Sequence, residues 1–136
     1  MAVIVNLWAV LGATVANFAL GMLWYGPLFG KYWMGLMGFT QKSMKSMKMS
    51  PVKSMVFGFI STIVMATVLS TIVFYTDAAG VLGGMYVGLL VWLGFLAPKG
   101  LGAVLWENKS WNLYLLNTAY DLVSLLIMGS ILAVWA

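Results

Sequence analysis

Only three acidic side chains are available for chemistry in this chain, and one of them falls inside a hydrophobic stretch. That residue is Asp121, which lies in the apolar segment that runs from Trp111 to Trp135. Residues three and four positions apart share one face of a helix, so this segment carries a polar stripe. The stripe consists of Tyr114, Asn117, Asp121 and Ser124. A carboxylate near the middle of a bilayer costs ~3 kcal/mol and faces protein or water rather than lipid. We therefore expect Asp121 either to pair with a cationic side chain or to bind a proton or another small cation.

The residue types that the chain lacks exclude most catalytic and metal sites. It has no cysteine and no histidine, which removes disulfides, thiolate nucleophiles, imidazole bases and the usual transition-metal ligands. Serine–histidine–acid and cysteine–histidine sites are therefore impossible. We predict a protein that is not an enzyme and that binds no cofactor and no metal.

The overall composition predicts the elements that must position Asp121. The chain is 63% hydrophobic and 7% charged, which is typical of a membrane protein rather than a soluble domain. Its long apolar runs are sufficient to cross a bilayer as helices. We predict an all-α integral membrane four-helix bundle of two helical hairpins, with a short amphipathic segment between spans one and two. One transmembrane domain would cover residues 1–136, with spans at about 3–25, 52–76, 82–106 and 111–135.

The end of the third span decides which cation could meet Asp121. A short span would stop at Ala97, whereas a longer span would kink at Pro98 and continue to Trp106. We favour the longer span, because an obvious polar turn follows Trp106. In a hairpin of that length, Lys99 comes within reach of Asp121 and is its natural counter-ion. Alternatively, Lys99 reaches the lipid headgroups alone.

Small residues recur at four-residue spacing in the first three spans, which favours close approach of helices. The first span also carries Asn17, a polar residue that should face protein. The residues predicted to pack the helices together are Ala13, Gly21, Gly58, Ala66, Gly80, Gly84 and Gly88.

The net charge of +4 comes from seven lysines in and beside the loops, so it indicates topology rather than nucleic-acid binding. Lys42, Lys45 and Lys48 fall on one arc of a short amphipathic helix, where they would face anionic lipid headgroups. All seven lysines belong to the loops that a cytoplasmic face would carry. By the positive-inside rule, both termini should lie on the non-cytoplasmic side.

Spans one and three share a weak sequence pattern. An aromatic residue and a glycine are followed by proline and then lysine, in Trp24 to Lys31 and again in Trp92 to Lys99. Two tandem hairpins related by duplication would have this pattern, and so would two unrelated spans with similar interfacial ends.

Two stretches resemble a known family. They are LWYGPLFGKYWM, at the end of the first span, and the run from Ala97 to Trp106 that leads to LYLLNTAY. Together with the four spans, they resemble the small bacterial membrane proteins grouped as domain of unknown function 1761, over nearly the whole chain. The resemblance implies a multi-pass protein of the inner (cytoplasmic) membrane of a bacterium, and it implies no activity.

These observations bear on three candidate functions. The first is a non-catalytic membrane protein that packs through its small-residue faces, with itself as a homo-oligomer or with other membrane subunits as an accessory subunit. The second is a small oligomeric transporter or channel that uses Asp121. The third, an enzyme acting on lipid, lacks plausible catalytic groups.

Overall fold

The structure, a computed structural model, is helical throughout its regular elements and describes residues 5–40, 43 and 50–135. Four helices in this part of the chain are long and apolar enough to span a membrane. They are Leu7–Leu28, Val52–Tyr75, Gly80–Trp106 and Trp111–Val134. The predicted fold class is therefore confirmed. The third of these helices continues past Pro98 to Trp106, which is the longer of the two alternatives.

Two of the four long helices are interrupted, so the helical elements are more numerous than the spans. The elements are α1 (Leu7–Leu23), the π-helical turn η1 (Trp24–Leu28), α2 (Gly30–Met37), α4 (Pro51–Tyr75), α5 (Gly80–Val91), the π-helical turn η2 (Trp92–Leu96), α6 (Ala97–Gly100), α7 (Gly102–Trp106) and α8 (Trp111–Val134).

Side-chain caps set the start of three long helices. The side chain of Asn6 accepts hydrogen bonds from the backbone N–H groups that follow it, and Ser50 and Ser110 do the same for α4 and α8. The α4–α5 turn contains Asp77 and Gly80, both with positive φ. Gly80 was predicted to pack helices, but it is exposed and a side chain there would meet nothing within 4 Å. Its φ of 74° is instead what the turn requires.

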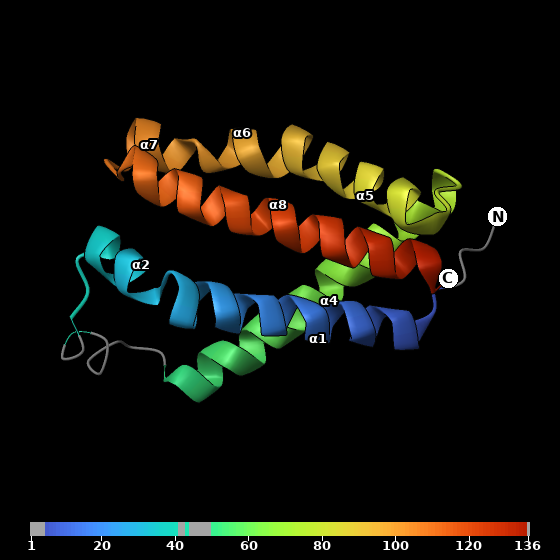
Figure 1. The fold of residues 1–136 in the computed structure, drawn as a ribbon, viewed down its shortest axis with the longest axis horizontal. Helices are drawn as coiled ribbons and strands as arrows, with labels where there is room; N and C mark the ends of the chain where they lie inside the picture. Colours follow the sequence, from blue (N-terminus) through green and yellow to red (C-terminus); the bar gives the residue numbers. More distant parts are fainter. Residues whose placement is uncertain (1–4, 41–42, 44–49, 136) are drawn as a thin grey trace.

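Helix α8 lies at the centre of the bundle, where it packs against α1, α4 and α5. Figure 1 shows α1, α8 and the α5–α7 run alongside one another, while α4 crosses them obliquely. Helix α1 begins and α8 ends at the same end of the bundle, beside the α4–α5 turn. The opposite end, which we call the lysine end, holds α2 with Lys31, the start of α4 with Lys53, and the α7–α8 turn with Lys109.

Helices α5 and α8 touch through their backbones. A Cβ atom at Gly84 would overlap the carbonyl oxygen of Gly129, and one at Gly88 would overlap the carbonyl oxygen of Leu125. Both glycines are buried. Glycine allows this approach because it has no side chain to hold the helices apart. Gly84 and Gly88 thus lie where the sequence predicted a packing face.

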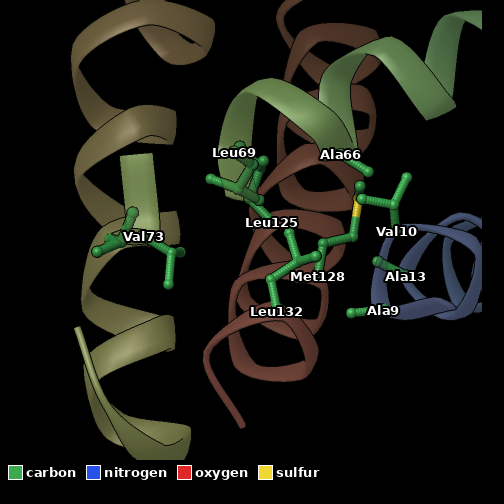
Figure 2. Packing of buried hydrophobic residues seen from close by; sticks show 10 residues of the cluster. Ala9, Val10, Ala13, Ala66, Leu69, Val73, Leu125, Met128 and Leu132 are labelled. Atoms are coloured by element: carbon green, nitrogen blue, oxygen red, sulfur yellow. The ribbon is translucent and has the colours of Figure 1, made fainter. Parts of the chain in front are cut away.

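The hydrophobic core fills the half of the bundle near the chain termini. Ala13 of α1 and Ala66 of α4 are fully buried there, as the small-residue pattern predicted. They pack with larger side chains from α8, among which Met128 is also fully buried (Figure 2). In the other half, residues 52–57 of α4 are exposed, so the beginning of α4 stands clear of the bundle.

The two π-helical turns fall on the repeated sequence pattern. Trp24–Leu28 interrupts the first span and Trp92–Leu96 interrupts the third. Gly26 departs from helical geometry inside the first turn, with φ −111° and ψ −108°, next to Pro27. Because a π turn contains one extra residue, it rotates the residues after it by about 100° relative to an unbroken helix.

The predicted amphipathic segment between spans one and two lies largely outside the described residues. Lys42, Lys45 and Lys48 lie outside them as well.

Candidate functional site

A groove lies between α8 and the end of the third span, and we call it the Asp121 groove. It encloses about 220 Å³. Its lining residues are Leu96, Gly100, Ala103, Lys109, Leu113, Tyr114, Asn117, Thr118 and Asp121. Lys109 belongs to the α7–α8 turn at the lysine end, whereas Asp121 lies ten residues into α8, a rise of about 15 Å. The groove therefore connects the lysine end of the bundle with the intramembrane carboxylate.

Asp121 is partly buried and makes no hydrogen bond or ion pair with any other residue in the described part of the chain. The predicted ion pair with Lys99 is therefore not present. Lys99 is exposed on α6 and does not line the groove. The π turn Trp92–Leu96 gives the physical reason, because its extra residue rotates the helix that follows and carries Lys99 away from the expected face. Lys109 is the lysine that shares the groove with Asp121.

Thr118 also lines the groove, and its buried hydroxyl group has no hydrogen-bond partner among the described residues. Its side chain is 9% exposed, and its Oγ1 has no hydrogen-bond partner. Threonines in α1 and α4 behave differently, since Thr14, Thr62 and Thr67 each donate to the carbonyl four residues earlier at 2.8 Å. A buried hydroxyl without a partner costs free energy unless a water or ligand satisfies it. The groove therefore has an unsatisfied hydroxyl group buried beside it, in addition to its polar lining residues Asn117 and Asp121.

Two further members of the predicted stripe fix the walls of the groove. Tyr114 donates its hydroxyl hydrogen to the carbonyl oxygen of Ala97 at 2.6 Å, which ties α8 to α6. Asn117 accepts through Oδ1 from the hydroxyl of Tyr25 at 2.8 Å, which ties α8 to the end of the first span.

A second polar cluster surrounds Asn17 on the other side of α8. Asn17 is buried, and its Nδ2 donates to Thr62 Oγ1 at 3.3 Å. Its Oδ1 accepts from the hydroxyl of Tyr120 at 2.9 Å and also from the hydroxyl of Ser124. The cluster joins α1, α4 and α8 through hydrogen bonds that satisfy Asn17, as a polar residue inside a membrane requires.

The side chains of the predicted stripe therefore lie on two sides of α8 rather than on one. Asp121 and Tyr114 face the third span, while Ser124 bonds to the first span and Asn117 contributes to both sides. Gly21 and Gly58 lie on the first-span side, against Tyr120 and Phe18 respectively.

The sequence reasoning missed several residues that form these clusters. The sequence analysis predicts no contact for Tyr25, Tyr120, Trp92 or Thr118. The indole N–H of Trp92 donates to the carbonyl oxygen of Thr118 at 2.8 Å, beside the groove. The repeated aromatic–glycine pattern was the signal that could have found Tyr25 and Trp92, since each lies within a π turn.

The Asp121 groove contains groups that can bind a proton or a small cation reversibly. Its polar lining includes the carboxylate of Asp121 and the amide of Asn117, whose Oδ1 accepts from Tyr25. Within the described ranges, no three acidic, histidine or cysteine side chains come together as a metal centre would require. Asp121 can hold a proton or accept a small cation, and Lys109 places a positive charge at the lysine end of the groove.

Comparison with known proteins gives a family for the chain. No curated protein and no solved structure shows significant similarity to it. A family model described as "Protein of unknown function (DUF1761)" matches residues 8–133. The chain therefore belongs to the DUF1761 family.

Proposed function

We propose that this chain is a non-catalytic membrane protein that binds a proton or a small monovalent cation at Asp121 and acts as the unit of a small transporter or channel. The single observation that carries the proposal is the groove that runs from the lysine end of the bundle to Asp121. Intramembrane carboxylates in protein cavities commonly mark ion and proton pathways. Thr118 supports the proposal, because it lines the same groove and its buried hydroxyl group has no hydrogen-bond partner in the described part of the chain.

The lysine end is the side from which the cation would enter. The described lysines belong to elements at or toward the lysine end, so the positive-inside rule assigns this end to the cytoplasm. These lysines are Lys31, Lys53, Lys99 and Lys109. The location that follows is the inner membrane of a bacterium, with both termini on the non-cytoplasmic side.

The other hypothesis is that the chain forms a homo-oligomer or is an accessory subunit of a larger complex. Such an assembly would complete the path that the groove begins. A cavity of about 220 Å³ within one chain does not form a continuous path, so transport would need a further copy or another membrane subunit. Ala13, Ala66, Gly84 and Gly88 are buried within the single chain. An assembly would therefore use other surfaces than these small-residue faces.

Reconstitution into liposomes tests the proposal. Vesicles containing the full chain and a trapped pH-sensitive dye are given a pH gradient, and cation flux is followed with and without sodium or potassium. We expect Asp121→Asn to abolish the flux, because asparagine has nearly the same shape but cannot exchange a proton or carry a charge. Asp77→Asn, in the exposed α4–α5 turn, is the matched control and should conduct like the parent.

A folding control separates loss of transport from loss of structure. Both variants should elute from a sizing column in detergent like the parent and should unfold at a similar temperature. Equal flux in the parent and in a folded Asp121→Asn variant would refute the proposal. A parent chain that supports no flux above empty vesicles would refute a transporter built from copies of this chain alone.

A further inference from the structure

A pair of grooves lies on the opposite side of the bundle from the Asp121 groove, where α1 and α4 diverge. The inner groove encloses about 420 Å³ and the outer groove about 450 Å³. The inner groove is lined by Asn17, Phe18, Gly21, Met22, Tyr25, Met55, Gly58, Thr62 and Tyr120. The outer groove is lined by Val15, Phe18, Met22, Met55, Val56, Phe59 and Ile60.

The two grooves flank one ridge. The ridge consists of three residues that line both grooves, Phe18, Met22 and Met55. Its two methionines are 61% and 50% exposed. The rings of Phe18 and Phe59 meet with their centroids 5.3 Å apart, and this contact joins α1 to α4 beside the ridge. Toward the lysine end the helices separate, since the first turns of α4 are exposed. Each groove is therefore an elongated slot in the lipid-facing surface.

The chemistry of both slots is hydrocarbon-like. Every residue that lines the outer groove is apolar. The inner groove contains polar residues, but these already bond within the protein: Asn17 with Thr62 and Tyr120, and Tyr25 with Asn117. The inner groove thus presents ring faces and methylene groups, in contrast with the unpaired carboxylate of the Asp121 groove.

Positive charge lies at the lysine end of the ridge. Lys53 is exposed and belongs to the first turn of α4, where it shares a helix face with Val56, a residue of the outer groove three positions later. The first turn of α4 contains no acidic residue, and the N-terminus of a helix attracts anions. A phosphate group at this level would meet both the lysine and the helix end.

We propose that the paired grooves bind one anionic diacyl phospholipid of the lysine-side leaflet. One acyl chain occupies the inner groove, the other occupies the outer groove, and the ridge lies between them. The phosphate group sits at Lys53 and the start of α4. Two slots that share one ridge fit a two-chain lipid better than a second protein helix, which would need a single continuous face. This site does not depend on the proposed role of Asp121.

Native mass spectrometry of the full chain tests the site. The protein is released from micelles that contain equal amounts of dioleoyl phosphatidylglycerol and dioleoyl phosphatidylcholine. We expect one retained phospholipid per chain, with phosphatidylglycerol preferred. Lys53→Gln should weaken retention of phosphatidylglycerol about fivefold, which corresponds to about 1 kcal/mol per lysine near an anionic headgroup. Lys99→Gln, on α6, is the matched control and should retain the lipid like the parent.

Gly58 allows the inner groove to be filled without disturbing the bundle. A Cβ atom there would meet only Phe18, at an ordinary 3.7 Å. Gly58→Leu should therefore fold normally but lose the lipid, whereas Gly58→Ala should keep it. Thermal unfolding, with and without added phosphatidylglycerol, provides a second measurement. Added phosphatidylglycerol should raise the unfolding temperature only of the variants that bind the lipid.

Three results would overturn the proposal. The first is lipid retention by a folded Gly58→Leu variant equal to that of the parent, which would place the lipid elsewhere. The second is equal retention of the two phospholipids, which would remove the role of the anionic headgroup. The third is a lipid-free dimer whose formation is blocked by Gly58→Leu, which would assign the grooves to a second copy of the chain.

Discussion

Replacing Gly84 with alanine should force α5 and α8 apart. A Cβ atom at this position would overlap the carbonyl oxygen of Gly129 and lie 2.8 Å from the Cα atom of Ser130, where real Cβ atoms essentially never come closer than 3.0 Å. Both obstacles are backbone atoms, so no side chain can rotate away. Overpacking of this kind costs about 1–3 kcal/mol. We therefore expect Gly84→Ala to have a free energy of unfolding lower by an amount in this range than that of an alanine variant on the same helix without the clash.

Gly83 provides the matched control on the same helix. A Cβ atom there would meet Ala78 at 3.5 Å or more, which is ordinary van der Waals contact. Both alanine variants gain the same helix propensity, about 1 kcal/mol relative to glycine. The difference between them therefore isolates the clash. Equilibrium unfolding of both variants in mixed micelles, followed by circular dichroism, measures this difference.

A second substitution tests whether the cost arises from this contact. A Cβ atom at Gly129 would overlap the carbonyl oxygen of Gly84, so both substitutions push the same two helices apart. The double variant should therefore lose less stability than the sum of the single losses, by more than the ~0.5 kcal/mol that independent sites allow. A Gly84→Ala variant as stable as Gly83→Ala would refute the close approach of α5 and α8.

Three further predictions follow from the remaining contacts. Asn17→Leu should lower the free energy of unfolding by about 1–3 kcal/mol, because the hydroxyl groups bonded to the Asn17 side chain would lose their partner. Asn112→Ala, at the exposed start of α8, should change the free energy of unfolding by less than about 0.5 kcal/mol. Unfolding in detergent measures both changes. In a double-mutant cycle, the changes in unfolding free energy caused by Lys99→Met and Asp121→Asn should add within ~0.5 kcal/mol, since no ion pair joins these residues. Coupling of several kcal/mol, as for a buried ion pair, would contradict the structure. A reporter fused after Ala136 should signal the non-cytoplasmic side, and one inserted within residues 41–50 the cytoplasmic side; the reverse pattern would contradict the orientation inferred from the lysines.

The helices and their closest contacts could be predicted from the sequence because they depend on local features. A long apolar run is sufficient to specify a span, and small residues at four-residue spacing mark a face regardless of which helix covers it. Gly84 and Gly88 lie on such a face and meet α8. Gly80 fits the same spacing but serves a turn, because the α4–α5 connection and not the helix face decides its role.

The candidate site could be predicted only in part, because it depends on how the helices are rotated and crossed. Counting residues along a regular hairpin placed Lys99 beside Asp121, but the π turn before Lys99 rotates it away. The bond from Tyr25 to Asn117 joins residues 92 positions apart, and the π turn Trp24–Leu28 positions the tyrosine. Neither turn follows from hydrophobic periodicity, although the repeated aromatic–glycine pattern marks both places.

Water access to the inner end of the Asp121 groove tests the central claim most directly. The chain has no cysteine, so a single introduced thiol can be followed without background. A thiol reacts as its thiolate, which requires contact with water. Asn117→Cys, in the groove and one helical turn from Asp121, should react with a small cationic methanethiosulfonate added from the lysine-bearing side of the membrane. Leu115→Cys, exposed on the outer face of the same helix, should stay unmodified because it faces lipid. Modification of both variants at equal rates, or of neither, would contradict a water-accessible path to Asp121.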